Sequence, residues 1–272
     1  MLSHNGPRFV GGPAGKIWID DGGFGELPVI LAHSFAGSSA QWSAQVAHLR
    51  DHERAVAFDF RGHGQSAPPT NNDYSVKSLS EDLGAVIDAI DADKVVLVGH
   101  SMGGSAAIAY AGAHPQRVAG LMLVGTPGRT PTDQAAKVLA SLEADYETVM
   151  NGYWNKLLAG AAPDVRSQIA AEMHQLSREA SLAIIRTMFN FDPLPVLKRY
   201  PGPALDVNTP HGDMPGSLHR LLPDLPHREI SGTSHWLHMD KPDEFNQVLD
   251  EFLVDTEARR GSEHGVGRHD AR

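Results

Sequence analysis

The chain has 272 residues, with 23 lysines and arginines against 33 aspartates and glutamates, so its formal net charge is −10. This charge disfavours binding to nucleic acid or to an anionic membrane, and the lack of cysteine excludes disulfides, thiolate metal sites and a cysteine nucleophile. No apolar run has the length of a signal-peptide core or of a membrane span. We therefore expect a cytoplasmic protein that acts on a small molecule, with a homodimer left open.

The first half of the chain alternates between predicted strands and predicted helices. Residues 1–15 are rich in glycine, proline and polar side chains, and we expect them to be a flexible N-terminus. A short strand is predicted at 17–21, and apolar runs typical of buried strands follow at 28–32, 55–60, 94–98 and 118–124. Segments with helical periodicity separate several of these runs, and Ser78 and Glu81 have the spacing of a capping box. Such alternation predicts an α/β fold with a mostly parallel central sheet flanked by helices.

Gly99-His100-Ser101-Met102-Gly103 lies where one predicted strand gives way to an alanine-rich helical segment. A serine at the tip of so sharp a turn has a strained backbone, and neighbours without a Cβ let strand and helix approach each other. This is the pattern of a nucleophile elbow, in the strand–turn–helix context that the motif requires. Ser101 is therefore the candidate nucleophile.

The alternation stops over residues 131–200, which are helical in character and rich in aromatic side chains and methionines. We interpret this stretch as a helical cap or lid inserted before the last two strands, because insertions in α/β folds tend to lie over the carboxyl ends of the strands. Additional helices packed on the core are the alternative. The α/β core would then comprise residues 16–130 and 201–255.

Strand-like segments return at residues 204–209 and 227–231, and each is followed by a polar loop. The first loop contains Asp213 and the second contains His235. A helix starting at Pro242 follows, and residues 256–272 are polar and charged enough to be expected as a disordered C-terminal tail. A serine hydroxyl needs a base and a group that orients the base, so Ser101, His235 and Asp213 form a candidate catalytic triad.

Four motifs together resemble the α/β-hydrolase-fold superfamily, in its serine-nucleophile branch of esterases, lipases and haloperoxidases, over roughly residues 16–255. They are the elbow, the His33-Ser34-Phe35 turn, the loop at residues 59–66, and Gly232-Thr233-Ser234-His235 before a proline-started helix. The chain order Ser, Asp, His is also the one found in that fold. We expect His63 and Arg61 to organise the 59–66 loop rather than to act on substrate.

The resemblance implies an oxyanion hole made by the backbone N–H groups of Phe35 and Met102. Ser34 stands where relatives usually have glycine, and the loop before Asp213 lacks a common glycine and is one residue longer. Asp206 competes with Asp213 as the triad acid, but it falls inside a predicted strand, where an unpaired carboxylate would be costly. The candidate pocket residues are Ser34, His100, Tyr153, Trp154, Met188 and Trp236.

The predicted function is hydrolysis of a small carboxylic ester, thioester or lactone through an acyl-enzyme on Ser101. Hydrolysis of a carbon–carbon bond and perhydrolase (non-metal haloperoxidase) activity need the same triad and stay open. A non-catalytic ligand-binding protein and a cofactor-independent oxygenase are further alternatives. No cofactor is expected, and no metal site either, because His235 and His238 are not accompanied by ligands at metal-binding spacing.

Overall fold

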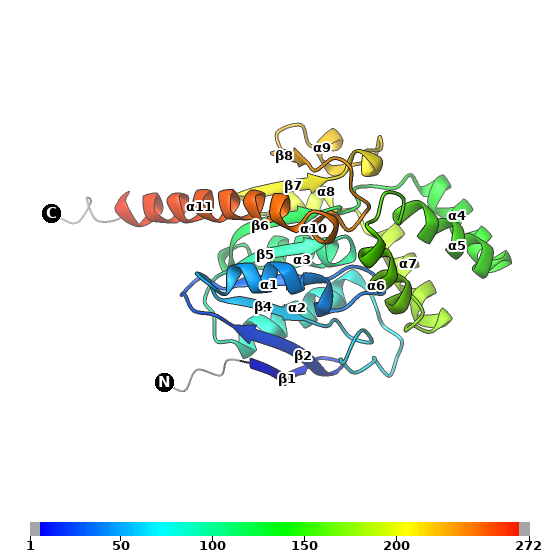
Figure 1. Ribbon diagram of the computed structural model, residues 1–272, viewed down its shortest axis with the longest axis horizontal. Coiled ribbons are helices and arrows are strands. Elements are labelled where there is room, and N and C mark those ends of the chain that lie inside the picture. Colours follow the sequence, from blue (N-terminus) through cyan, green and yellow to red (C-terminus); the bar gives the residue numbers. More distant parts are fainter. Residues whose placement is uncertain (1–5, 267–272) are drawn as a thin grey trace.

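The structure is a computed structural model that describes residues 6–266, and its centre is an eight-stranded sheet (Figure 1). The strand order is β1-β2-β4-β3-β5-β6-β7-β8, parallel from β4 to β8 and antiparallel at β1–β2 and β2–β4. The strand bounds are β1 Gly6–Gly12, β2 Gly15–Gly22, β3 Val29–Ala32, β4 Ala55–Phe58, β5 Val95–His100, β6 Val118–Val124, β7 Ala204–Asn208 and β8 His227–Glu229. The four strands from β3 to β6 are buried along their whole length, which explains their continuous apolar runs.

Helices cover both faces of the sheet, and the core is correspondingly divided into two clusters. One face carries α2 (Val76–Ala89), α3 (Met102–Ala113) and α8 (Leu194–Leu197), and the other carries α1 (Ser43–Leu49), α10 (Leu237–Asp240) and α11 (Pro242–Val266). The predicted α/β class with a mostly parallel sheet is confirmed. The N-cap of α2 is Ser75, whose hydroxyl accepts a hydrogen bond from the Ser78 N–H at 3.1 Å, so the predicted capping box starts three residues too late.

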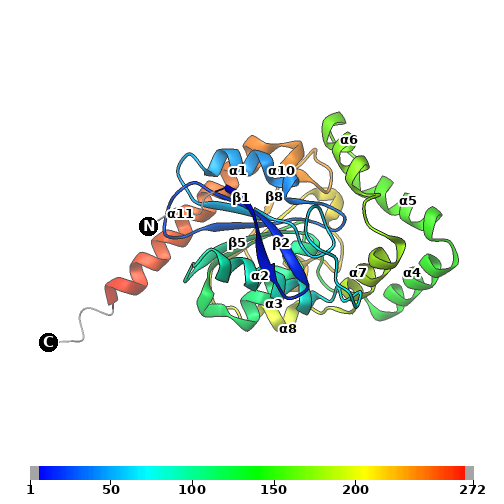
Figure 2. The ribbon, with the colours of Figure 1, turned by 90° about the horizontal axis from the view of Figure 1, so that it is seen from below.

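Residues between β6 and β7 form the helices α4 (Thr132–Ala144), α5 (Tyr146–Leu157), α6 (Pro163–Glu172) and α7 (Arg178–Asn190), followed by α8. Figures 1 and 2 show α4 to α7 gathered at one end of the molecule, whereas the far end of α11 projects from the opposite end. We call α4 to α7 the helical insertion. Two short 3-10 helices, Ser39–Trp42 and Pro210–Gly212, lie in loops at the carboxyl ends of β3 and β7, and α9 (Leu218–Leu221) precedes β8.

Residues 6–12 and 256–266 are more ordered than the composition indicates, and residues 1–5 lie outside the described part of the chain. Residues 6–12 pair with β2 through an antiparallel ladder, so the segment expected to be loose is an edge strand from Gly6 onward. The tail expected to be disordered from residue 256 instead continues α11 to Val266, and residues 267–272 lie outside the described part of the chain. Within residues 6–266, none of the helices has the length and apolarity that crossing a membrane requires.

Candidate active site

Ser101 occupies a strained turn between β5 and α3. Its backbone has φ 53° and ψ −111°, outside the regions that side-chain-bearing residues prefer, and its N–H donates to the Val124 oxygen at 2.9 Å. A Cβ on Gly99 would lie 2.6 Å from the Gly103 oxygen, and one on Gly103 would lie 2.4 Å from the Ala32 oxygen. The glycines of the motif therefore let β5, α3 and the end of β3 meet at the serine.

The turn after β3 lies against this elbow, because the Ala32 and His33 carbonyls are the nearest neighbours of Gly103. His33 is fixed at both ring nitrogens: Nδ1 donates to the Ser34 oxygen at 2.8 Å, and Nε2 accepts from the Phe60 N–H at 3.0 Å. Burial lowers the pKa of His33 to about 4, so its ring is neutral at pH 7. The turn that contains Ser34 and Phe35 is thus held rigidly beside Ser101.

A buried polar chain links that turn to the helical insertion. The Ser34 hydroxyl donates to Gln41 Oε1 at 3.0 Å, and Gln41 Nε2 donates to Glu172 Oε2 on α6 at 2.7 Å. All three side chains are buried, and burial raises the pKa of Glu172. Sequence reasoning missed Glu172, since nothing local marks a contact across 131 positions. The hydroxyl of Ser34 is engaged in this chain and does not stand free in a pocket.

The His235 loop reaches the same region. A Cβ on Gly125, the residue after β6, would lie 3.1 Å from the ring carbon Cε1 of His235. Burial lowers the pKa of His235 to about 4, which leaves the imidazole in its basic, neutral form at pH 7. Among residues 6–262, neither the His235 ring nor the Ser101 hydroxyl has a hydrogen-bond partner, an arrangement common before substrate binds.

The backbone of this loop is anchored from three sides. The His235 N–H donates to the Leu157 oxygen of α5 at 3.0 Å, and its carbonyl accepts from His100 Nε2 at 3.0 Å. Asp240 accepts from the Ser234 N–H and from the Ala162 N–H, each at 2.7 Å. His100 therefore supports the loop from a fully buried position. Asp240, which the sequence analysis did not single out, ties the loop to the helical insertion.

Asp213 is not brought to His235. Its carboxylate is paired with the Arg220 guanidinium and lies 3.1 Å from His219 Nε2. The Arg220 hydrogen bond is the main cause that lowers the pKa of Asp213 to about 2. The Ser217 hydroxyl closes the loop by accepting from the Met214 N–H at 2.9 Å. The lengthened loop thus folds onto α9, and the expected Asp213–His235 hydrogen bond does not form in this structure.

Asp206 lies inside β7, as predicted, and is fully buried. It is not unpaired, however: its Oδ2 accepts from Asn208 Nδ2 at 2.7 Å and lies 3.1 Å from His219 Nδ1. It makes no hydrogen bond to His235, so within residues 6–262 no carboxylate is hydrogen-bonded to the candidate base.

An aromatic stack joins the helical insertion to the site. Trp154 of α5 stacks on Phe35 with ring centroids 5.6 Å apart, and on Trp236 at 6.2 Å. Trp154 and Trp236 are buried, whereas Tyr153 is 40 % exposed and touches Trp154 edge-on. Met188 is partly buried within the apolar packing of the insertion. Of the predicted pocket residues, Trp154 therefore lies against Phe35 in the turn after β3 and against Trp236 in the His235 loop.

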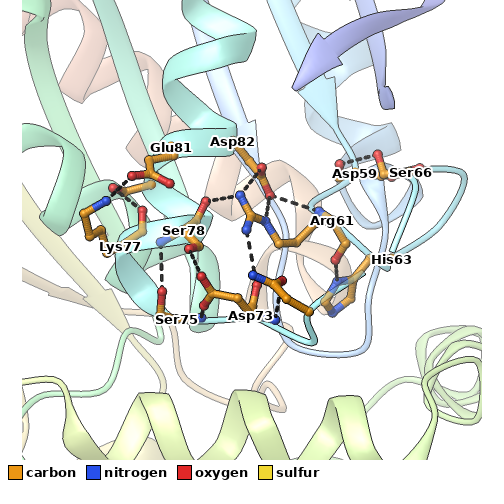
Figure 3. Close-up of polar contacts among 12 residues, drawn as sticks. Asp59, Arg61, His63, Ser66, Asp73, Ser75, Lys77, Ser78, Glu81 and Asp82 are labelled. Carbon is orange, nitrogen blue, oxygen red and sulfur yellow. Dashed lines mark hydrogen bonds and ion pairs between the residues drawn. The ribbon is translucent and has the colours of Figure 1, made fainter. Parts of the chain in front are cut away.

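The loop at residues 59–66 is a structural support. Arg61 reaches Asp82 of α2 through two nitrogens at 2.8 and 2.7 Å, and it also donates to the Ser78 carbonyl (Figure 3). His63 Nδ1 donates to the Arg61 carbonyl at 2.9 Å. The Asp59 carboxylate accepts from the Ser39 and Gln65 N–H groups. These contacts agree with the expectation that Arg61 and His63 organise the loop.

Neither Ser101 nor His235 belongs to a cluster of metal-ligating side chains. Among the described residues, two groups of three such side chains place their ligand atoms within 4.8 Å of one another, and both consist of other residues. His238, three positions after His235, packs its ring against Trp42 with centroids 4.1 Å apart. The arrangement therefore brings a serine in a strained turn and a neutral histidine to the carboxyl ends of the central strands.

Comparison with known proteins agrees with this geometry. Residues 28–202 match the model of the alpha/beta hydrolase fold family. The chain is 29 % identical to "Putative carbamate hydrolase RutD" of Caulobacter segnis, over 84 % of this chain and 92 % of that protein. A solved structure of a thermophilic esterase from Thermogutta terrifontis superposes with a TM-score of 0.77 at 24 % identity, covering 92 % of this chain and 98 % of that one.

A further relative has a much longer chain. The dihydrolipoyllysine-residue acetyltransferase component of the acetoin cleaving system of Pseudomonas putida is 39 % identical over 111 residues, which are 41 % of this chain and 30 % of that protein. The family match spans most of the chain, includes the elbow and agrees with the sheet topology. The chain therefore belongs to the alpha/beta hydrolase fold family and is a hydrolase of that fold.

Proposed function

We propose that this hydrolase cleaves a small carboxylic ester, thioester or lactone through an acyl-enzyme on Ser101. The observation that carries the proposal is the strained Ser101 backbone at the elbow, with φ 53°. The ring of the preceding residue, His100, lies with its centroid 4.7 Å from the centroid of the neutral His235 ring. A non-glycine residue is held in so unfavourable a conformation only where the surrounding structure enforces it, and such positions cluster at active sites. The names of the two full-length relatives, a carbamate hydrolase and an esterase, both denote cleavage at a carbonyl carbon.

The reaction begins as His235 accepts the Ser101 proton and Oγ bonds to the carbonyl carbon. The N–H groups of Met102 and Phe35 stabilise the oxyanion, because each belongs to a segment packed against the elbow. When the tetrahedral intermediate collapses, the bond to the leaving group breaks and His235 returns the proton to that group. Water, deprotonated by His235, then attacks the acyl carbon and releases the acid together with free Ser101.

We propose further that Ser101 and His235 act as a dyad, with the His235 loop positioned by Asp240 instead of by a carboxylate on the ring. The support is that Asp213 is held by Arg220, while Asp240 binds the backbone of the residue before His235. Asp213→Asn is then expected to keep activity within about tenfold. A loss of about 10⁴-fold, the cost of removing a triad carboxylate, would restore Asp213 as the acid.

The helical insertion serves in this proposal as the cap that bounds the substrate pocket. Trp154 meets Phe35 of the oxyanion turn on one side and Trp236 of the base loop on the other. Aromatic rings at this position favour an acyl or alkyl group of apolar character, since apolar walls with few polar groups are typical of small-molecule sites.

The test is release of p-nitrophenol from short-chain p-nitrophenyl esters, together with labelling by a fluorophosphonate probe. Ser101→Ala should abolish both readouts. Ser105→Ala is the matched control: this serine lies one turn further along α3, is buried and has no hydrogen-bond partner for its hydroxyl. Turnover that survives Ser101→Ala would refute the acyl-enzyme. No turnover of any ester, combined with cleavage of a β-diketone, would instead support carbon–carbon bond hydrolysis.

A further inference from the structure

Three side chains converge beside the edge of the sheet, apart from Ser101 and His235. Asp206 comes from β7, His219 from α9 and His227 from β8, where His227 is paired with Asp206 in register. His219 Nδ1 lies 3.1 Å from Asp206 Oδ2, and His227 Nδ1 lies 3.7 Å from the same oxygen. Side-chain exposure is 0 % for Asp206, 16 % for His219 and 28 % for His227.

Two atoms at this junction are buried without a hydrogen-bond partner, namely Asp206 Oδ1 and His227 Nδ1. A buried carboxylate needs compensation by a charge or by hydrogen bonds, and here one oxygen has neither. Both unsatisfied atoms, carboxylate oxygen and imidazole nitrogen, are of the kind that bind a divalent transition metal. The junction therefore leaves one carboxylate oxygen and one imidazole nitrogen without a hydrogen-bond partner among the described side chains.

The surroundings have the organisation found around metal ligands. His219 turns its other nitrogen, Nε2, to the Asp213 carboxylate at 3.1 Å, and Asp213 is in turn held by Arg220. Asp206 accepts a hydrogen bond from Asn208 at 2.7 Å. Metal-bound histidines usually donate their second N–H to a carboxylate, and metal-bound carboxylates are themselves hydrogen-bonded.

We propose that Asp206, His219 and His227 form a site for a divalent transition metal ion, with Zn²⁺ the best match. In a tetrahedral site whose ligand atoms lie about 2.0–2.1 Å from the ion, neighbouring ligand atoms are about 3.3 Å apart. The distances from Asp206 Oδ2 to His219 Nδ1 and to His227 Nδ1, 3.1 and 3.7 Å, are close to this value. The imidazole rings of His219 and His227 are stacked with centroids 3.9 Å apart. Because the rings are packed against each other, the ion enters as the partly exposed His227 ring tilts away from His219. Water would complete the coordination.

The role of such an ion is to hold β7, α9 and β8 together, and it does not depend on the chemistry of Ser101. The sequence does not reveal this site, because the three ligands are 13 and 8 positions apart in separate elements and match no metal-binding motif. No metal site was expected because no carboxylate–histidine cluster has metal-binding spacing along the chain, whereas these three side chains come together only in the fold.

The experiment uses tag-free full-length protein, treated with a chelator and then titrated with Zn²⁺ by calorimetry and with Co²⁺ by visible spectroscopy. We expect one equivalent of Zn²⁺ at this site and the visible absorption of four-coordinate Co²⁺. His227→Gln should abolish both the Zn²⁺ binding and the Co²⁺ absorption. Asp213→Asn should weaken metal binding by about 10- to 100-fold, because Asp213 is the hydrogen-bond partner of the ligand His219. Ser101→Ala should bind as the unmodified protein does.

The matched control is His52→Gln, which disrupts the other potential ligand group, formed by His48, His52 and Asp250 on the surface. If His52→Gln retains the Co²⁺ spectrum, the proposal is supported. If His52→Gln loses the spectrum while His227→Gln retains it, the proposal is overturned. X-ray absorption of Zn²⁺-loaded unmodified protein needs no variant to fold. A Zn²⁺ coordination shell with two imidazoles and one carboxylate supports the site. Failure of the protein to bind one equivalent of Zn²⁺ refutes it.

Discussion

Gly103→Ala tests whether the turn that contains Phe35, the proposed source of an oxyanion donor, depends on its close packing against the elbow. The new Cβ would lie 2.4 Å from the Ala32 oxygen and 2.6 Å from the His33 oxygen, where ordinary contact starts at 3.4 Å. Because both neighbours are backbone atoms, no side chain can rotate away to relieve the overlap. The turn that contains Phe35 must therefore move by about 1 Å.

That displacement sets the expected magnitude. A shift of about 1 Å in a catalytic group costs about 10²-fold in rate, and loss of one oxyanion donor costs about 10²- to 10³-fold in kcat. The overpacking itself costs about 1–3 kcal/mol of stability. We therefore expect kcat on p-nitrophenyl esters to fall by at least about 10²-fold while the protein still folds.

The control is the same substitution at Gly152 in α5, where a Cβ would meet nothing within 4 Å. Gly152→Ala should keep full activity and gain about 0.5–1 kcal/mol, because alanine is the better helix former. Both variants are compared by ester kinetics and by urea denaturation. If Gly103→Ala folds and retains the kcat of the unmodified protein, the packing argument and the placement of the oxyanion donor in this turn are wrong.

Two further predictions concern buried charge. Asp82→Ala leaves the Arg61 guanidinium, whose side chain is 5 % exposed, without its carboxylate partner. The free energy of unfolding, measured by urea denaturation, should fall by about 3–5 kcal/mol. The control Asp88→Ala removes a side chain that pairs with Arg117 and is 70 % exposed, and it should lower the free energy of unfolding by less than about 1 kcal/mol. Equal losses would contradict the assigned burial. His238 is buried neutral, with its pKa lowered to about 3 by burial. It therefore stabilises the fold above the unfolded pKa of about 6.5, and this contribution is lost as pH falls toward 3. His238→Leu should reduce the dependence of unfolding free energy on pH below 6.5 by up to about 1.4 kcal/mol per pH unit, and an unchanged slope would refute the assignment.

The features that sequence alone predicted well are those written in neighbouring residues. Ser101 could be located because Gly99 and Gly103 lie in the same turn, where a Cβ at either position would overlap backbone atoms. The buried strands could be located because strands covered on both faces must be apolar throughout. His235 follows from a similarly local pattern, a short loop after the last strand and before the helices at the C-terminal end.

Features that depend on distant partners were missed or misplaced. The composition of residues 6–12 indicates a flexible segment, but in the structure these residues form backbone hydrogen bonds with β2, and Arg8 pairs with Asp21. The sequence also does not show that Arg220 pairs with the Asp213 carboxylate, so the absence of a hydrogen bond between Asp213 and His235 could not be foreseen. Charged composition indicated a disordered end from residue 256, but α11 continues as a helix through residues 256–266. In each case the deciding interaction lies outside the window that a local pattern covers.

Under the proposed function, the hydrogen-bonded chain from Ser34 through Gln41 to Glu172 would couple movement of α6 to the position of the turn that contains Phe35. If α6 swings outward to admit a substrate, Gln41 loses the carboxylate that holds its amide, and the hydroxyl next to Phe35 loses its fixed acceptor. Outward movement of α6 would thus loosen the turn that holds Phe35, the proposed oxyanion donor, and its return would restore the position of that turn. An open molecule would bind without reacting, and only the closed one would turn over.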